Sequence, residues 1–156
     1  MGHKQPPHDN ELEKAVLSCI FHSRIKESRL QPEDFFGRAH QRIYEGMLSV
    51  LDKELSLDLL ALKIELGRKG SSHLDESGGL AYISSILNAV PSSANYDYYV
   101  RAVKDHSLRR DLLRLAGEIG KAAYDEALDM RQILAGVKAG LEEITVSAEV
   151  SKPGEK

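Results

Sequence analysis

The fold is decided by residues 96–144, which read YDYYVRAVKDHSLRRDLLRLAGEIGKAAYDEALDMRQILAGVKAGLEEI. In the first half, apolar residues recur every three to five positions, close to a helical period; they are Val100, Val103, Leu108, Leu112, Leu115 and Ile119. The second half opens at Asp129, a good N-cap with Gln132 three residues later. Its apolar side holds Ile133, Leu134, Val137, Leu141 and Ile144. Only the short polar break 124–128 separates the halves, so we predict an antiparallel helical hairpin.

This hairpin has more apolar surface than two helices can hide. Two packed helices bury one seam between them, and that seam cannot cover Leu112, Leu113, Leu115, Leu134 and Leu141 together. Each leucine left in water forgoes roughly 1.5–3 kcal/mol of burial. We therefore expect a partner surface and interpret the hairpin as a device for association.

Length and composition fit one soluble helical domain. The chain has 156 residues, of which 42% are hydrophobic and 29% charged, with no tryptophan. Its net charge of −3 disfavours nucleic acid as a sole, direct partner. The single cysteine, Cys19, excludes an intramolecular disulfide and fits a reducing compartment, where we expect it to be buried. Neither a membrane span nor a signal peptide is visible, so we expect a cytoplasmic protein.

The residues before the hairpin predict a globular bundle of about six helices. Asn10 followed by Glu13 is a capping-box pattern that opens the first helix. Pro32 suits the first position of a short helix. We expect Phe35 and Phe36, which follow it, to turn inward as core anchors.

Three more helices are expected between the short helix and the hairpin. Apolar periodicity predicts a helix over 39–53. Asp58 is a plausible N-cap for the next helix, and residues 71–79, rich in Ser and Gly, are expected to form a loop before a helix over 80–90. No segment alternates as a strand does, so the predicted fold class is all-α.

These patterns divide the chain into four parts. They are a flexible N-terminal arm (1–8), a globular head (9–105), the hairpin (106–145) and the start of an interdomain linker (146–156). The boundary at 105 is placed where the polar residues 105–107 interrupt the apolar stripe. Ser92 or Ser93 is expected to cap the helix that carries Tyr96.

Enzymatic chemistry finds little support in this sequence. A phosphate-binding loop of the Walker type needs two glycines at a fixed spacing before Lys and Ser or Thr; residues 117–121 come nearest, but with the wrong spacing and inside a helix. No pair of histidines has the spacing of a zinc helix except His3 and His8 in the arm. His40 shares a helix face with Tyr44 and is best interpreted as a hydrogen-bonded histidine at the core boundary. We predict no catalytic, metal-binding or cofactor-binding residue.

A local basic cluster lies on the first hairpin helix. It consists of Arg101, Lys104, Arg109, Arg110 and Arg114. One interpretation is a solvated helix face paired with nearby carboxylates such as Asp105 and Asp111. The other is a docking surface for an acidic partner or for passing DNA.

The residues also carry a resemblance to a known family. The matching pieces, in order, are the helix after Pro6-Pro7, LQPEDFF at 30–36 with His40 and Ile43-Tyr44, Gly78-Gly79 with Tyr82-Ile83, VPSSAN at 90–95, and residues 100–110. Together they resemble the N-terminal domain of the DnaB-type bacterial replicative DNA helicase, from about residue 7 to residue 145.

The resemblance implies a concrete role in DNA replication. In that family the domain pairs hairpin to hairpin, three pairs form a collar on a hexameric ring, and the collar docks primase and the helicase loader in the primosome. It also implies that ATP and Mg act in a RecA-like motor domain beyond a linker, so the chain is expected to be a piece of a longer, ATP-dependent helicase. DNA would be only an indirect partner, and no cofactor is expected on this chain.

Two sets of site residues follow from hairpin and resemblance together. The expected oligomer interface is Leu108, Leu112, Leu115, Ile119, Ile133, Leu134, Val137, Leu141 and Ile144. The expected partner-docking residues are Tyr98, Arg101, Lys104, Arg109 and Arg110. The alternative function is a free-standing helical adaptor or inhibitor that binds a helicase ring.

Overall fold

The computed structural model describes residues 4–90 and 92–150. Its elements are α1 (Asn10–Ser23), the 3-10 helix η1 (Pro32–Asp34), α2 (Arg38–Asp52), α3 (Leu59–Arg68), α4 (Ser71–Glu76), α5 (Gly79–Leu87), α6 (Tyr96–Tyr124) and α7 (Met130–Val150). The described residues contain no β-strand, which confirms the all-α prediction. The first residues of the expected arm (1–3) and the end of the expected linker (151–156) lie outside the described residues.

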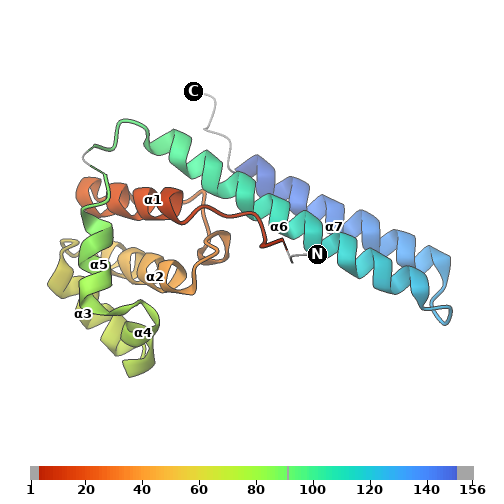
Figure 1. Cartoon of the computed structure of the whole chain (residues 1–156), viewed down its shortest axis with the longest axis horizontal. Coiled ribbons are helices and arrows are strands. Elements are labelled where there is room, and N and C mark those ends of the chain that lie inside the picture. The colour runs from red at the N-terminus through yellow and green to blue at the C-terminus, as the bar shows by residue number, and fades with distance from the viewer. Residues whose placement is uncertain (1–3, 91, 151–156) are drawn as a thin grey trace.

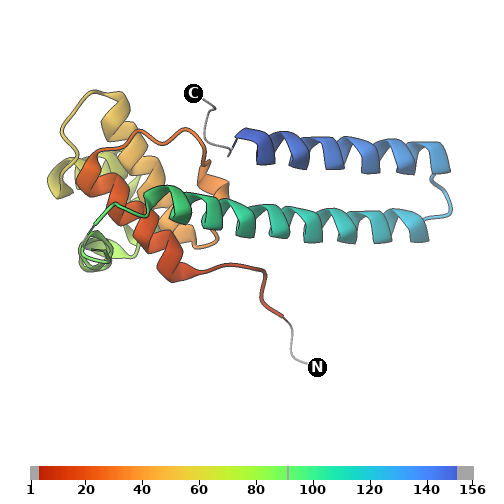
Figure 2. The same ribbon diagram turned by 90° about the horizontal axis from the view of Figure 1, so that it is seen from above.

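The short helices gather at one end of the molecule, and two long helices extend from it. Helices α1 to α5 form the head. Helix α6 extends away from it, and α7 runs back beside α6 in the opposite direction (Figures 1 and 2). The first half of α6 packs on α1, and α7 packs on α6. Helix α6 ends at Tyr124 and α7 begins at Met130, so the expected break falls where the chain turns back.

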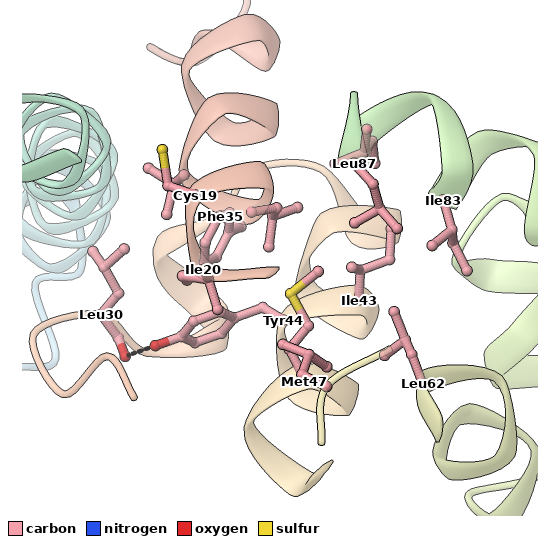
Figure 3. Packing of buried hydrophobic residues seen from close by; sticks show 14 of the residues in the cluster. Cys19, Ile20, Leu30, Phe35, Ile43, Tyr44, Met47, Leu62, Ile83 and Leu87 are labelled. Atoms are coloured by element: carbon pink, nitrogen blue, oxygen red, sulfur yellow. Dashed lines mark hydrogen bonds between the residues drawn. The ribbon is translucent and has the colours of Figure 1, made fainter. Parts of the chain in front are cut away.

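The core of the head lies between α1, α2, α3 and α5. Phe35, Ile43, Tyr44 and Met47 are fully buried there, and Figure 3 shows them facing Ile20 of α1 together with residues of α3 and α5. The Tyr44 hydroxyl donates a 2.8 Å hydrogen bond to the Leu30 carbonyl, which holds the connection after α1 against the core (Figure 3). The expected burial of Cys19 is confirmed.

The start of α1 corrects one sequence expectation. Asp9, not Asn10, is the N-cap, and its carboxylate accepts hydrogen bonds from the backbone N–H groups of Glu11 and Leu12. Glu13 is therefore not a capping-box partner. Its buried carboxylate accepts from the backbone N–H groups of Phe36 and Gly37 instead.

Glu13 belongs to a polar network that links three helices. Its Oε1 lies 2.8 Å from His40 Nδ1, and His40 Nε2 lies 2.8 Å from the Tyr82 hydroxyl. His40 is 2% exposed, so it is the buried, hydrogen-bonded histidine that the sequence suggested. The network fixes α1, α2 and α5 in place because each buried polar atom in it has a partner.

Three other expectations need correction. Residues 71–76 of the expected loop form α4, because Leu74 packs against the core and tertiary packing stabilises a short helix that propensity alone does not. Phe36 is 38% exposed, since only Phe35 reaches the core. Asn95 is the N-cap of α6 and no side chain caps it; Ser92 Oγ instead accepts from the Ala94 N–H. By contrast, the Asp58 cap is confirmed by a 2.8 Å bond from the Ala61 N–H.

Candidate interaction surface of the hairpin

The base of α6 is fixed to the head by buried apolar and ionic contacts. Tyr96, Val100 and Val103 are buried against the head. Lys104 Nζ lies 3.1 Å from Asp34 Oδ2, and the Ser107 hydroxyl donates a 2.7 Å bond to Asp34 Oδ1. Residues 105–107, where the sequence suggested a boundary, lie inside the continuous helix α6.

Arg110 ties the N-terminal arm to the same base. Its guanidinium donates to the Pro7 carbonyl at 2.7 Å and to the Asp34 carbonyl at 2.8 Å. It also lies over the Phe36 ring, on which His8 stacks with ring centroids 4.0 Å apart. The half-exposed Phe36 is thus covered by the arm.

A second ionic cluster holds the loop after α1 to the start of α6. Glu27 is 6% exposed and accepts hydrogen bonds from the Arg29 side chain and backbone and from the Tyr96 hydroxyl. Burial alone would raise the pKa of Glu27, but these hydrogen bonds outweigh it and lower the pKa. Arg29 also donates to Asp97 at 2.9 Å. The hairpin therefore starts from a rigid base.

Beyond this base, α6 packs on α7 through a narrow apolar seam. Leu115, Ile119, Ile133 and Val137 line it, and they surround an apolar groove of about 290 Å³ between the two helices. A Cβ on Gly140 would lie 2.6 Å from Leu115 Cδ1, so the helices approach closely there. The seam joins the two helices without burying any residue of α7.

One side of the hairpin next to this seam is apolar and open to water. At 3.6 residues per turn, Lys138 flanks the seam on one side, and so do five apolar residues. They are Leu112, Ala116, Met130, Leu134 and Leu141, called here the apolar hairpin face; its leucines are 47%, 60% and 47% exposed in chain order. The opposite side carries Arg114, Glu118, Lys121 and Glu143 by the same count. The hairpin is therefore apolar on one side and charged on the other.

The nine hairpin residues expected at an oligomer interface fall into two groups. Leu112, Leu134 and Leu141 are exposed. The other six are half-buried; they are Leu108, Leu115, Ile119, Ile133, Val137 and Ile144. The sequence pattern predicted both groups together, because the seam and the face beside it belong to one apolar stripe.

The five expected docking residues do not form one surface. Tyr98 is 65% exposed, and Arg101 and Arg109 are exposed, with Arg109 Nε 2.8 Å from Asp105. Lys104 is 4% exposed and paired with Asp34, which corrects its expected role as a docking residue. Arg110 is half-buried against the arm.

Other kinds of site find no support among the described residues. No three His, Cys, Asp or Glu side chains gather there as a metal site would need. None of the helices in that part of the chain has the length and apolar character needed to cross a membrane. The hairpin is the principal candidate for a functional surface.

Comparison with known proteins finds a family and solved structures with this architecture. Residues 5–105 match the family described as the DnaB-like helicase N terminal domain. The chain belongs to that family. The crystal structure of the N-terminal domain of DnaB helicase from Mycobacterium tuberculosis superimposes with a TM-score of 0.81 at 28% identity, covering 89% of this chain and 99% of that one. The resemblance inferred from the sequence motifs is confirmed.

Two relatives are replicative DNA helicases by name. The replicative DNA helicase DnaB of Geobacillus stearothermophilus is 40% identical over 123 residues, which cover 76% of this chain and 27% of that protein. The replicative DNA helicase DnaC of Bacillus subtilis (strain 168) is 32% identical over 148 residues, covering 92% of this chain and 32% of that protein. This DnaB-like chain thus spans about a third of the length of the relatives it matches.

A further solved structure shares the fold alone. It is described as the structure of a DnaB-like replicative helicase and its interactions with primase. It superimposes with a TM-score of 0.75 at 24% identity and covers 95% of this chain and 33% of that one.

Proposed function

We propose that this DnaB-like domain is the oligomerising and partner-docking part of a hexameric, ATP-dependent replicative DNA helicase. The observation that supports it best is the apolar hairpin face, which holds three exposed leucines beside a seam that its own chain leaves partly open. Such a face favours association because each half-exposed leucine gains part of the roughly 1.5–3 kcal/mol that full burial contributes. The occupant that fits by symmetry is the same face of a second copy.

In the proposed assembly, two hairpins pair and three pairs form a collar. A paired hairpin buries Leu112, Leu134 and Leu141 against their counterparts, while the charged side stays in water. The rigid base formed by Asp34, Lys104 and Arg110 keeps each hairpin at a fixed angle to its head. Binding and hydrolysis of ATP with Mg belong, in this proposal, to a motor domain of the longer protein, and DNA contacts the collar only indirectly.

The test is the mass of the whole chain by sedimentation equilibrium at micromolar concentrations. We expect self-association, and Leu134→Asp should shift it toward monomer because the carboxylate would be desolvated without a partner. Val146→Asp is a matched control, since Val146 is also 60% exposed but lies on the side of α7 away from the apolar hairpin face. A strictly monomeric chain, or equal effects of both variants, would contradict the pairing.

Primase and the helicase loader are the proposed docking partners. A helicase of the same fold is described with its interactions with primase, and this likeness supports primase here. The exposed residues Tyr98, Arg101 and Arg109 are the proposed contacts. Titration calorimetry with primase of the same organism should show weaker binding for Arg101→Glu, while Lys121→Glu on the charged side of the hairpin serves as a charge-matched control. Unchanged binding by Arg101→Glu and Arg109→Glu would exclude this surface.

A further inference from the structure

Helix α3 carries large apolar residues on two opposite sides but is buried on only one. Leu62 and Leu66 are fully buried against the head. The outer side of the helix carries Leu60, 65% exposed, and Ile64, 49% exposed, one helical turn apart. A surface helix normally carries charged or polar residues on the side away from the core. The outer side of α3 therefore lacks a cover within this chain.

This exposure is concentrated in one place on the head. Across the described part of residues 9–95, the exposed large apolar side chains are Phe36, Leu55, Leu60 and Ile64. Phe36 lies under Arg110 and His8, so the other three, all within residues 55–64, remain open to water. Scattered single residues would need no explanation, but a local group marks an interaction surface.

Basic side chains border the apolar residues. Lys63 and Arg68 lie on either side of Leu60 and Ile64 around the helix; we call residues 60, 63, 64, 67 and 68 the α3 outer face. Lys69, which follows the helix end, lies toward α2 instead. Within the described chain, no carboxylate lies within 4.0 Å of Lys63 or Lys69, and Arg68 Nε lies 3.8 Å from Glu65. A Cβ on Gly67 would meet nothing within 4 Å, so another backbone can approach closely.

The acidic residue of the helix neutralises this border only in part, through its long contact with Arg68. Glu65 is 5% exposed and points to α2, where it accepts a 2.6 Å bond from Lys53 and a 2.8 Å bond from Ser49. These bonds lower the pKa of Glu65 and keep its negative charge on the side of the helix that faces α2. The outer face is therefore positively charged in a chain whose net charge is −3.

We propose that the α3 outer face binds an acidic amphipathic helix of another protein. Apolar residues of that helix would cover Leu60 and Ile64, and its Asp or Glu residues would meet Lys63 and Arg68. Within this chain, the second half of α7 is itself an acidic amphipathic helix. It is not the proposed occupant, because its Leu141 belongs to the apolar hairpin face. Helix α3 also lies on the part of the head away from the hairpin (Figure 1) and packs on α2 and α4. A different protein is thus the better occupant, and the inference stands independently of hairpin pairing.

The test uses two synthetic peptides and the whole chain. Both peptides are about 18 residues long, long enough to be helical, with one leucine stripe flanked by glutamates in the first and by lysines in the second. Fluorescence anisotropy should show the glutamate peptide binding at least about tenfold more tightly than the lysine peptide. Leu60→Glu with Ile64→Glu should weaken its binding at least about tenfold, and Ser84→Glu on α5 should not. Lys63→Glu with Arg68→Glu should reverse the preference between peptides.

Several results would contradict this proposal or the hairpin pairing. No saturable binding of the glutamate peptide, or a preference that survives charge reversal at Lys63 and Arg68, would overturn the proposal. A lower sedimentation mass of the free Leu60→Glu variant would show that a second copy occupies the face, which also overturns it. A chain that is monomeric yet binds the glutamate peptide through α3 would contradict hairpin pairing alone.

Discussion

Lys104 Nζ lies 3.2 Å from Oδ1 and 3.1 Å from Oδ2 of Asp34, although the two residues are 70 positions apart in the sequence. Lys104 is 4% exposed and Asp34 is 6% exposed. The same carboxylate accepts hydrogen bonds from the Ser107 hydroxyl and the Gln31 N–H. This ion pair joins η1 of the head to α6 and thereby sets the direction in which the hairpin leaves the head.

Removing the lysine should destabilise the chain strongly. Lys104→Met keeps the side-chain volume but leaves the Asp34 carboxylate buried without its cation, which costs about 3–5 kcal/mol. Urea unfolding at one fixed protein concentration measures this loss, since self-association adds to stability. The double variant Lys104→Met with Asp34→Asn should recover part of it, because the uncompensated charge is gone. A single variant as stable as wild type would show that water already compensates the carboxylate.

Acid should unfold the chain partly through Glu27. Its folded-state pKa is lowered from the ordinary 4.5, so the folded state binds fewer protons than the unfolded state. Its contribution to stability is fully present above pH 4.5 and is lost as the pH falls through the lower folded-state value. Glu27→Gln should cost roughly 1–3 kcal/mol at neutral pH, because Arg29 loses its buried carboxylate partner.

The pH profile separates this effect from a simple packing defect. The difference in unfolding free energy between wild type and Glu27→Gln should be constant from neutral pH down to about 5 and should shrink below 4.5. Glu76→Gln is a useful comparison, because the pKa of Glu76 is also lowered by arginine partners but its carboxylate is not buried. A difference that stays constant at low pH would show that Glu27 does not titrate as argued.

The sequence predicted the elements that depend on local pattern. The hairpin turn, the Asp58 cap and the short helix at Pro32 follow from periodicity and from residues with strong positional preferences. The exposed leucines of the hairpin could also be anticipated, because an apolar stripe too wide for one seam must be open somewhere. Such signals reside within a few turns of one helix.

Contacts between residues far apart in the sequence cannot be predicted from such local patterns. Lys104 was placed in a surface cluster because it lies among arginines, and nothing near it in the sequence points to Asp34. A signal did exist, since Lys104 shares a helix face with the buried residues Val100, Val103 and Ser107. Glu13 was likewise assigned to a cap, although its partners are Phe36, Gly37 and His40. Buried charges are matched across the fold, and one sequence cannot show which partner is near.

Replacing Gly46 or Gly136 by alanine should change the free energy of unfolding in opposite directions. Gly46 of α2 faces α3, where an added Cβ would lie 2.8 Å from Leu62 Cδ1 and 3.1 Å from Leu66 Cδ2. Both leucines are fully buried, so they cannot move aside, and the overpacking costs about 1–3 kcal/mol. Gly136 of α7 is open, with nothing within 4 Å of an added Cβ. There, alanine should gain about 1 kcal/mol from its higher helix propensity.

Urea unfolding of Gly46→Ala and Gly136→Ala provides the comparison, with each variant measured at the same protein concentration. Gly46→Ala should lower the free energy of unfolding, because the strain exceeds the propensity gain. It should also loosen α3 against α2, which hydrogen exchange of the α3 amides would report. Gly136→Ala should raise the free energy of unfolding and leave α3 unchanged. Equal gains from both substitutions would mean that α2 and α3 are not packed as closely as the Gly46 contacts indicate.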